Sequence, residues 1–401
     1  MARAPRIAII GGGIGGLAAA RALMLRGVEV AVYEQAPRLS EFGGGVVTTP
    51  NAMKALRGLG VEDVAFADAF APAHQTVLSW RSGRVIDRTR LDPYRERFGA
   101  PFCTMHRGDL LEALRRAVGD AAIRLDARCI AVASDARGAS ARFADGSAIE
   151  ADAIIGADGI HSAVRTGLFG SEHPRFTGYA CWRGLVPVDR LPPGLAPPDM
   201  TAWWGPHGHV VHYHVRRGEL LNWVAHTETD AWTEESWSRE GDLDEVARTY
   251  ARWNRRLLDV FAATERCYKW ALYDREPLDR WSVGRVTLLG DAAHAMLPYL
   301  AQGAAQSLED ACVLAAEIAA RPDDPAAALQ AYAAVRIPRT RRIQLGARAR
   351  GRDNHLPSVW ARFKRDARLA LRRWFAPGTA LHRADWIFSY DAAGHAARAS
   401  P

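Results

Sequence analysis

Cysteine is scarce in this chain of 401 residues, and its distribution excludes two kinds of structural support. The five cysteines are scattered, odd in number and include no Cys-x-x-Cys pair. A disulfide framework needs paired cysteines, and structural zinc sites commonly use closely spaced ones. The sequence therefore predicts a protein of the reducing cytoplasm without disulfides and without a metal site. These residues are Cys103, Cys129, Cys181, Cys267 and Cys312.

Long apolar runs are also missing. No stretch approaches the ~20 consecutive apolar residues that a helix needs to cross a bilayer. The apolar stretch after Met1–Arg6 resembles a signal peptide, but its glycines have the spacing of a nucleotide-binding turn. We therefore expect no transmembrane segment and a cytoplasmic location. With 48% hydrophobic residues, the chain is long enough to bury the cores of two lobes.

Lysine is nearly absent, although the chain carries a formal net charge of +7. Only Lys54, Lys269 and Lys364 are lysines, so the positive charge comes from arginine. The densest arginine cluster lies at 336–352, in a predicted helix, where basic tracts are usually solvated faces. Since no nucleic-acid-binding module accompanies it, we expect no nucleic-acid partner. The positive field still attracts anionic cofactors and aromatic carboxylates.

A glycine-rich turn near the N-terminus is the most informative segment present. The apolar run Arg6–Ile10 predicts a strand buried on both faces, and the glycines of residues 11–16 follow it directly. A helix-forming stretch comes next and ends at Gly27, a suitable C-terminal cap, before the strand Val28–Tyr33. Glu34 closes this unit, where a carboxylate can accept hydrogen bonds from an adenosine ribose.

Three of these glycines have separate physical roles. Gly11 permits the tight turn, Gly13 lets the backbone approach a pyrophosphate, and Gly16 lets the helix and strand pack closely. One such motif is a weak signal, but Ala157–Gly159 and Gly290–His294 follow it in a fixed order. That order is typical of an FAD-dependent monooxygenase.

The rest of the chain divides into two lobes and a helical tail. Between about 175 and 280 the hydrophobic period becomes two, and His209–Val215 can pair with Leu220–Ala225 across Arg217–Glu219. We expect an α/β fold with a Rossmann-like FAD-binding lobe of the glutathione-reductase type, an inserted, mainly antiparallel substrate lobe and a helical C-terminus. The predicted boundaries are 1–72, 100–175 and 280–335 for the FAD-binding lobe, 73–99 and 176–279 for the substrate lobe, and 336–401 for the helical segment.

In its motifs the chain resembles the single-component, class A flavoprotein aromatic hydroxylases, such as salicylate hydroxylase, 3-hydroxybenzoate 6-hydroxylase and 6-hydroxynicotinate 3-monooxygenase. The resemblance covers nearly the whole length. It implies tight, non-covalent FAD, transient NADH or NADPH, and a C4a-hydroperoxyflavin, formed with O2, that hydroxylates a phenolic aromatic or pyridine carboxylic acid. Beyond the first glycines, it rests on Gly156–Arg165, Trp182–Pro187 and Gly290–Ala304.

The resemblance also implies contacts to the cofactors. It places Asp158 by the FAD pyrophosphate and involves Asp158 and Arg165 in the use of the nicotinamide cofactor. Arg165 can pair with a phosphate or hold Asp158 in place, and a structural Asp–Arg pair is the plain alternative. Arg107 is placed against the FAD phosphates. Asp291 is placed on the ribityl hydroxyls, since a carboxylate can accept two hydrogen bonds.

At the flavin ring, Gly303 and Ala304 are expected to open the last helix of the FAD-binding lobe. Its N–H groups and dipole then face the isoalloxazine and favour negative charge there. Pro298 is expected to line the other side of the pocket and to contact the substrate. Enzymes that hydroxylate 3-hydroxybenzoate at the 6-position carry glutamine where Pro298 stands, so that substrate is disfavoured.

A base is needed to activate a phenolic ring. His209 and Tyr213 are the candidates, because their spacing of four puts both on one face of a strand while His212 and His214 face the other way. The same spacing occurs in the 3-hydroxybenzoate and 6-hydroxynicotinate enzymes, where the pair contacts the substrate hydroxyl. A core or solvent-facing histidine is the alternative for His209. His294 is a weaker candidate for the base and is expected to be structural.

The substrate itself remains open at this point. Arg183 or Arg84 can receive a carboxylate, but pairing inside the sheet explains Arg183 equally well. The leading prediction is a salicylate hydroxylase-like enzyme that acts on hydroxybenzoates. The alternative is a decarboxylating enzyme like 6-hydroxynicotinate 3-monooxygenase. A flavin-binding protein without turnover and an amine oxidase are alternatives from other classes. The sequence does not decide whether the reductant is NADH or NADPH, which ring carbon is hydroxylated, or whether the protein is a monomer or a homodimer.

Overall fold

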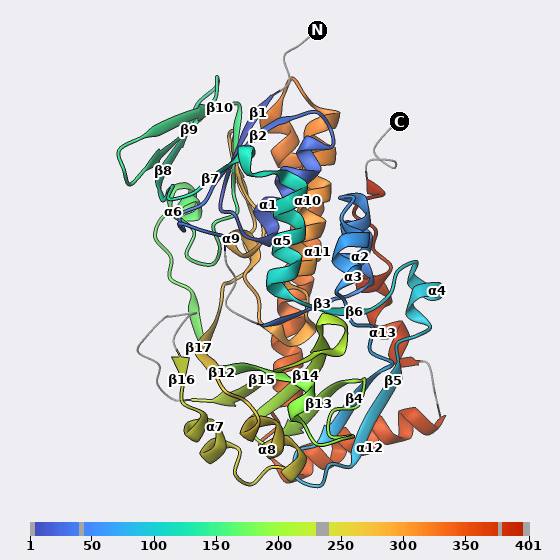
Figure 1. The fold of residues 1–401 in the computed structure, drawn as a ribbon. Helices are drawn as coiled ribbons and strands as arrows, with labels where there is room; N and C mark the ends of the chain where they lie inside the picture. The colour runs from blue at the N-terminus through green and yellow to red at the C-terminus, as the bar shows by residue number, and fades with distance from the viewer. Residues whose placement is uncertain (1–4, 40–43, 230–239, 376–378, 396–401) are drawn as a thin grey trace.

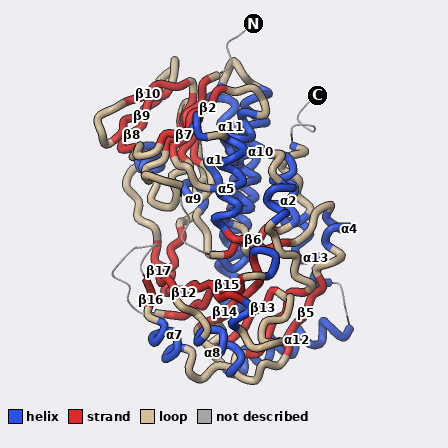
Figure 2. The backbone as a smooth tube through the Cα atoms, viewed as in Figure 1, coloured by secondary structure: helices blue, strands red, loops and turns tan. Residues whose placement is uncertain are grey.

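Two large β-sheets lie at opposite ends of the molecule, and long helices run between them (Figure 1 and Figure 2). The structure is a computed structural model of the chain, and it describes residues 5–39, 44–229, 240–375 and 379–395. A six-stranded sheet with its helices forms the first lobe, and an eight-stranded sheet with its helices forms the second lobe. This mixed α/β architecture with a helical C-terminus confirms the predicted fold class at that level.

The first lobe begins with the strand–turn–helix unit that the sequence predicts. β1 (Arg6–Ile10) pairs in parallel with β2 (Glu29–Tyr33) and with β11 (Ala153–Gly156), which explains why its residues are apolar. α1 (Ile14–Met24) and α10 (Gly303–Ala320) pack side by side in the core of this lobe. The strand order is β18, β19, β11, β1, β2, β7, parallel except for β18, and the outer strands are β7 (Ile123–Arg124), β18 (Ser282–Val283) and β19 (Val286–Leu288).

The second lobe is a mainly antiparallel sheet built from two separate stretches of the chain. β14 (Gly208–Val215) pairs with β15 (Leu220–Glu228) across η3 (Arg216–Gly218), as predicted. α7 (Leu243–Thr249) and α8 (Arg255–Ala262) cover the face of this sheet that carries its fully buried tryptophans. The order is β16, β17, β12, β15, β14, β13, β4, β5, with β4 (His74–Ser79), β5 (Val85–Arg90), β12 (Arg175–Pro187), β13 (Met200–Gly205), β16 (Glu240–Gly241) and β17 (Cys267–Asp274).

Smaller elements join or flank the two lobes. β3 (Gly45–Thr48) and β6 (Cys103–His106) form a two-stranded sheet between them (Figure 1). β8 (Cys129–Ser134), β9 (Ala139–Phe143) and β10 (Ala148–Ala151) form a three-stranded sheet at the outer end of the first lobe. The remaining elements are α2 (Pro50–Gly58), α3 (Glu62–Ala67), α4 (Tyr94–Phe98), α5 (Arg107–Val118), η1 (Asp120–Ala122), α6 (Ala163–Phe169), η2 (Val188–Arg190), α9 (Asp291–His294), η4 (Pro298–Leu300), α12 (Val359–Phe375) and α13 (Thr379–Phe388).

One helix of 30 residues, α11 (Pro325–Asn354), extends from the first lobe to the second (Figure 1). Near its start, the hydroxyl of Tyr332 donates to the carbonyl of Leu288 in β19 at 3.1 Å. Near its end, the guanidinium of Arg350 lies over the ring of Trp204 in β13, 4.8 Å from the centroid. The helix therefore continues without a break through the predicted boundary between the FAD-binding lobe and the C-terminal segment.

A buried cluster of charges joins α11 to α10. Arg336 donates through Nη1 to Glu309 at 2.6 Å and through Nε to Asp310 at 2.7 Å, and all three side chains are fully buried. Although burial opposes ionisation, Arg336 lowers the pKa of Glu309 below its usual value, and His294 together with Arg336 lowers that of Asp310. Arg339 adds a second contact to Glu309 at 2.7 Å. The expectation of a solvated arginine face is therefore wrong for this part of the 336–352 cluster, because its arginines neutralise buried carboxylates.

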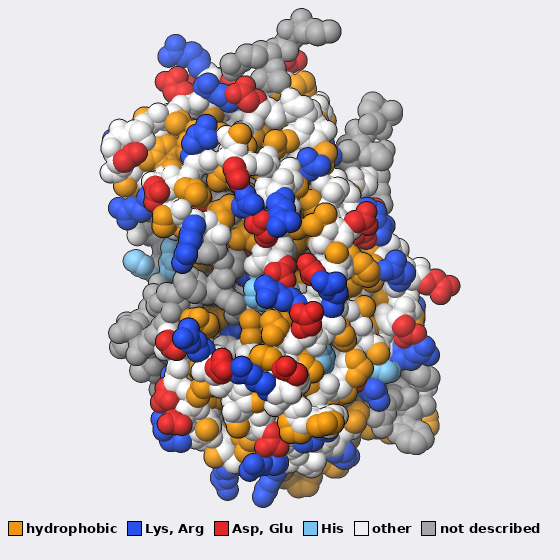
Figure 3. Space-filling model, viewed as in Figure 1, with side chains coloured by type: hydrophobic (Ala, Val, Ile, Leu, Met, Phe, Trp, Pro, Cys, Tyr) orange, Lys and Arg blue, Asp and Glu red, His pale blue; other side chains and the backbone are white. Residues whose placement is uncertain are grey.

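The surface mixes charges of both signs over the face shown in Figure 3. All five cysteines are buried and unpaired, as the sequence predicts. Within the residues that the structure describes, no helix is both long and apolar enough to span a membrane.

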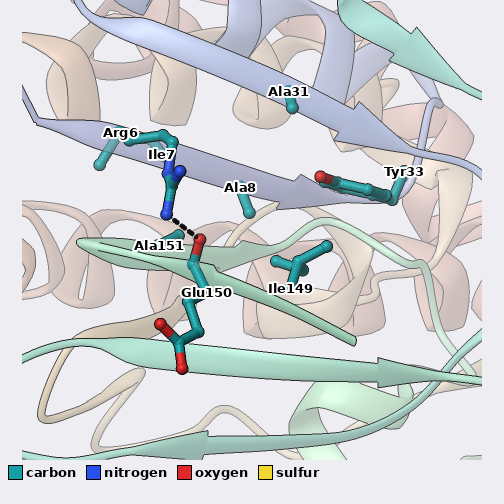
Figure 4. Close-up of a pocket in the computed structure, with 8 residues that line it drawn as sticks. All are labelled: Arg6, Ile7, Ala8, Ala31, Tyr33, Ile149, Glu150 and Ala151. Carbon is teal, nitrogen blue, oxygen red and sulfur yellow. Dashed lines mark hydrogen bonds between the residues drawn. The ribbon is translucent and has the colours of Figure 1, made fainter. Parts of the chain in front are cut away.

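A shallow hollow of 280 Å³ lies on the outer side of the six-stranded sheet, where β1 and β10 approach each other (Figure 4). Arg6 crosses it and donates through Nη2 to the carbonyl of Glu150 at 2.6 Å. The hollow sits at the start of β1, whereas ligands of parallel sheets bind beyond the carboxyl ends of the strands. It is therefore not the candidate site. Its lining residues are Arg6, Ile7, Ala8, Ala31, Tyr33, Ile149, Glu150 and Ala151.

The buried charge cluster generates a first prediction. Arg336→Met removes the guanidinium and leaves two buried carboxylates without their main partner, which should lower the free energy of unfolding by about 3–5 kcal/mol. Arg341→Met removes a partly exposed arginine that contacts the exposed Asp279, and it should cost about 1 kcal/mol or less. Urea unfolding of both variants beside the parent measures these differences, and equal losses would contradict the central role of Arg336.

Candidate active site

The three predicted motifs meet at one place in the first lobe. A Cβ atom at Gly11 would overlap the carbonyl oxygen of Ala157, so the first and second motifs are in backbone contact. A Cβ at Gly15 would lie 2.8 Å from Leu289 and 3.2 Å from Ser307, beside the third motif and α10. Segments far apart in the sequence therefore converge at the carboxyl ends of β1, β11 and β19.

The glycine turn has the geometry expected from its sequence. Gly11 has a φ of +109°, and a Cβ at Gly16 would overlap the carbonyl oxygen of Gly11. Gly13 faces open space, since no heavy atom lies within 4 Å of its hypothetical Cβ. Glu34 lies beside the turn at the end of β2, and its carboxylate accepts hydrogen bonds from the N–H of Gly12 at 2.6 Å and of Ala36 at 2.8 Å.

Asp158 and Arg165 lie near each other but have different partners. Asp158 accepts from the Ser162 hydroxyl at 2.5 Å and from the N–H of Val164 at 3.1 Å, and burial raises its pKa. The guanidinium of Arg165 is 2% exposed and donates to Glu172 at 2.5 Å. The alternative in which Arg165 holds Asp158 is therefore wrong, because the N-terminal turn of α6 already provides the donors to that carboxylate.

The stretch from Gly290 to Gly303 is anchored by the charge cluster. Asp310 Oδ2 accepts from the N–H of Gly290 at 3.0 Å and lies 2.6 Å from Nε2 of His294. His294 is 1% exposed, in line with the structural role expected for it. Asp291 and Pro298 are exposed in this stretch, so both are accessible to ligands.

Gly303 and Ala304 open α10, as predicted. No side chain caps this N-terminus, and no heavy atom lies within 4 Å of the hypothetical Cβ of Gly303. Arg107 opens α5, and its backbone N–H donates to the carbonyl of Gly44 at 2.8 Å. Gly44 also contacts Arg183 of the second lobe, and Tyr299, just before α10, contacts His209, so both helix starts lie near the junction of the two lobes.

One face of the second-lobe sheet is turned toward the first lobe, where it meets Gly45. His209 and Tyr213 share that face of β14, whereas His212 lies near Trp203 on the other side, which confirms the predicted alternation. The strand register extends the face across three strands in rows. One row contains His209, His226 and Cys181; the next contains Val211, Val224 and Arg183; the third contains Tyr213, Asn222 and Leu185.

Three buried histidines and a tyrosine form a compact group at the first row. Nδ1 of His209 lies 2.6 Å from Nε2 of His355, which follows α11. The rings of His209 and His226 stack with centroids 4.3 Å apart and an interplanar angle of 1°, and Tyr299 of η4 lies edge-on to both. Burial lowers the pKa of His209 and His226 well below the usual value and that of His355 to about 4.

These imidazoles are therefore neutral at pH 7, and the neutral form of histidine is the one that can accept a proton. Among the described residues, no three His, Cys, Asp or Glu side chains are arranged to hold a metal ion. The group is thus a set of neutral hydrogen-bonding side chains facing the Pro298 loop.

At the second and third rows, the sheet touches β3 and the residue before it. Asn222 Oδ1 accepts from the N–H of Gly45 at 2.7 Å, and a Cβ at Gly45 would overlap the ring of Tyr213. A Cβ at Gly44 would overlap the guanidinium of Arg183, which lies 4.9 Å from the ring centroid of Trp270. Glycine is favoured most strongly at Gly45, where the ring of Tyr213 leaves no room for a side chain, whereas at Gly44 the neighbour is the movable end of Arg183.

Burial raises the pKa of Tyr213 to about 12, so its phenol stays protonated at neutral pH. Arg84, the other candidate for a carboxylate, is exposed in the turn between β4 and β5. It does not lie on the face that carries Arg183.

Sequence reasoning missed four side chains of this site: His226, His355, Tyr299 and Asn222. The hairpin register alone places His226 opposite His209, and Tyr299 directly follows the predicted Pro298. His355 is 146 residues from His209, and no local pattern connects the two.

Comparisons with known proteins agree with this geometry. A family model described as an FAD binding domain matches residues 5–345. The chain belongs to that family. It is 40% identical over 390 residues to 3-amino-4-hydroxybenzoate 2-monooxygenase of Streptomyces platensis, covering 97% of each chain. It is 35% identical over 350 residues to 6-hydroxynicotinate 3-monooxygenase of Pseudomonas fluorescens, covering 86% of this chain and 90% of the relative.

A solved structure of a salicylate hydroxylase substrate complex superposes with a TM-score of 0.82 at 28% identity, covering 98% of this chain and 97% of that one. These findings confirm the resemblance drawn from the motifs and the prediction of an FAD-dependent aromatic monooxygenase. Use of NAD(P)H and O2 is typical of the family.

The described residues fit FAD on their own geometry. The N-terminal ends of α1 and α10 lie together, neither has a side-chain cap, and open space adjoins Gly13 and Gly303. Free N–H groups and helix dipoles suit a pyrophosphate at one helix and a negatively charged flavin at the other. Gly13 would adjoin the pyrophosphate, with Gly11 and Gly16 shaping the turn, Glu34 would face the adenosine ribose, and Gly303 with Ala304 would face the flavin.

The buried histidines predict a loss of stability in mild acid. Unfolded histidine has a pKa of about 6.5, and the pKa of His355 in the folded chain is about 4. Stabilisation by such groups is complete above the unfolded value and is lost as the pH falls toward the folded value, because the unfolded chain takes up protons first. We expect the thermal unfolding midpoint to decrease as the pH is lowered from 7.5 to 5.0. The decrease should be smaller in His226→Leu. The exposed His173→Gln should keep the parent's pH dependence, and three identical profiles would refute the assignment.

Proposed function

We propose that this enzyme hydroxylates a phenolic aromatic carboxylic acid bound between the flavin and the sheet face of the second lobe. One observation carries the proposal: a neutral histidine, His209, and a cation, Arg183, share that face. From the strand spacing their Cα atoms are separated by roughly 12 Å. Side chains extending from both ends leave room for a benzoate ring with its hydroxyl toward His209 and its carboxylate toward Arg183.

His209 is proposed as the general base. In the tautomer whose Nδ1 donates to Nε2 of His355, the Nε2 atom of His209 keeps a lone pair and is the atom available to accept a proton from the substrate. A neutral imidazole there accepts the phenol proton and raises the electron density of the ring. Tyr213, which stays protonated, donates a hydrogen bond and orients the substrate.

When bound, FAD supplies the hydride and oxygen chemistry, with NADH or NADPH as the reductant. Val211, Val224 and Leu297 keep the space beside the histidines apolar, which limits water access. Arg183 binds the carboxylate as a charge-assisted pair and thus sets which ring carbon faces the flavin.

The finer assignments belong to the same proposal. We propose a Rossmann-like nucleotide lobe of the glutathione-reductase type with the predicted boundaries, and FAD contacts from Arg107, Asp158 and Asp291. Arg165 and Pro298 are also proposed as cofactor contacts. The main contribution of Arg165 is to position α9, because its Nη1 donates to the Ala292 carbonyl at 3.2 Å. Pro298 also contacts the substrate. A cytoplasmic location, with the chain as a monomer or a homodimer, completes the proposal, and the buried unpaired cysteines are in keeping with that location.

A substrate panel tests the proposed function. FAD-loaded enzyme is mixed with NADH or NADPH and one of salicylate, 4-hydroxybenzoate, 3-amino-4-hydroxybenzoate or 6-hydroxynicotinate, and products are identified by mass spectrometry. We expect at least one phenolic acid to accelerate NAD(P)H oxidation and to gain one oxygen atom. NAD(P)H-independent consumption of an amine would favour an amine oxidase, and FAD binding without turnover of any acid would favour a non-catalytic flavoprotein.

The base assignment makes a sharper prediction. His209→Ala should bind FAD normally but slow hydroxylation by about 10²- to 10⁴-fold, because the phenol proton is no longer removed. Flavin reduction by NAD(P)H should change much less, and the two rates are separated by stopped-flow absorbance. His212→Ala is the matched control, a buried histidine on the opposite face of the same strand. Hydroxylation at the parent rate in His209→Ala would remove His209 from the mechanism.

A further inference from the structure

His226 is a buried histidine whose ring has no hydrogen-bond partner among the described residues. It is 3% exposed, and neither Nδ1 nor Nε2 makes a hydrogen bond of good geometry, although the backbone of His209 lies close enough to act on the ring. Leaving a buried polar group unpaired costs about 1–3 kcal/mol. Neutral imidazole carries one donor and one acceptor, so both lack a partner here. A ring in this state is suited to a ligand.

The fold gives this ring no structural task that its backbone does not already perform. The hydroxyl of Tyr250 donates to the backbone carbonyl of His226 at 2.8 Å from the covered side of the sheet. On the other side, the imidazole lies among His209, Tyr299 and Cys181 in the first row. Its side chain therefore faces the space assigned to the substrate.

The position of His226 relative to His209 is fixed by the strand register. The two residues are directly opposite on β14 and β15, and their rings lie parallel at 4.3 Å. Two rings stacked at this distance can contact substituents on adjacent carbons of one aromatic ligand. If the edge of His209 meets the phenol hydroxyl, the edge of His226 meets the neighbouring substituent on the aromatic ring.

We infer that His226 is a specificity residue that binds an uncharged hydrogen-bond donor, an amino group foremost, on the carbon next to the phenol hydroxyl of the substrate. The inference rests on the proposed function, because it takes His209 as the partner of the hydroxyl. The three imidazoles at this place are neutral and bring no charge of their own to an anionic substituent, and Arg183, whose charge also acts on His226, lies in the neighbouring row that is assigned to the carboxylate. An amine satisfies the acceptor nitrogen of His226 without bringing in a charge.

The Tyr299 hydroxyl supports the same conclusion. It is buried without a hydrogen-bond partner among the described residues, and its ring lies edge-on to His226 with centroids 5.5 Å apart. Two polar groups without partners thus lie at the same end of the space. That end is equipped for more hydrogen bonds than a single phenol hydroxyl makes.

A pair of substrates that differ in one amino group tests the inference. 3-Amino-4-hydroxybenzoate and 4-hydroxybenzoate are compared on FAD-loaded enzyme, by their dissociation constants from flavin absorbance changes and by kcat/KM for hydroxylation. The parent should prefer the amino compound. His226→Leu should lower that preference by about 10- to 100-fold, as expected when a hydrogen bond to a substrate group is lost. His226→Gln, which keeps a donor and an acceptor, should restore part of it.

His212→Leu is the control, since it removes a buried imidazole from the opposite face and should leave the preference unchanged. If His226→Leu does not fold, His226→Gln and the parent still give the comparison, because glutamine displaces the acceptor from its position and should weaken the preference measurably.

The outcomes separate this inference from the proposed function. Hydroxylation of both acids with a preference that His226→Leu leaves intact would overturn the inference and keep the function. A binding preference that depends on His226, without hydroxylation, would keep the inference and overturn the function. Failure of both compounds to bind would overturn both for this substrate class.

Discussion

Three buried charges hold the two halves of the active site together. Arg336 on α11 meets Glu309 and Asp310 on α10 with no exposure to solvent, and such charges are tolerated only when paired and hydrogen-bonded. Asp310 also accepts from the Gly290 backbone and contacts His294. The position of the third motif therefore follows from an ion pair that lies outside the motif. α10, α11 and the Gly290–His294 motif are placed relative to one another through this cluster.

The site divides into regions of different polarity. Neutral imidazoles occupy the first row of the sheet face because burial disfavours their charged forms, while Arg183 keeps its charge in the next row over the ring of Trp270. Gly44 and Gly45 let the first lobe approach this face closely. This difference in polarity is the basis for the proposed binding of a phenolic carboxylic acid across the face.

Much of this could be predicted from the sequence where the signal is local. The turn at Gly11 and the shared face of His209 and Tyr213 follow from spacing alone, since backbone geometry sets them. The partner of Arg165 could not be predicted. Ser162 and Val164 donate to Asp158 in its place, within a helix turn whose geometry appears only on folding. His226 needed the strand register, and His355 a contact between distant elements. These misses concern side-chain contacts, local at Asp158 and between elements at His226 and His355, and not the type of any element.

The long helix α11 has a consequence for how the chain tolerates change. It contains Arg336 in the buried charge cluster and leads at its far end into His355, which contacts His209. One added or deleted residue between these two points would turn everything beyond it by about 100° and shift it by about 1.5 Å. The imidazole would then leave its neighbour while the ion pair stayed in place. The 18 residues between Arg336 and His355 thus have a fixed length, because even a whole added turn, which restores the direction of the side chain, would move it by about 5.4 Å along the axis.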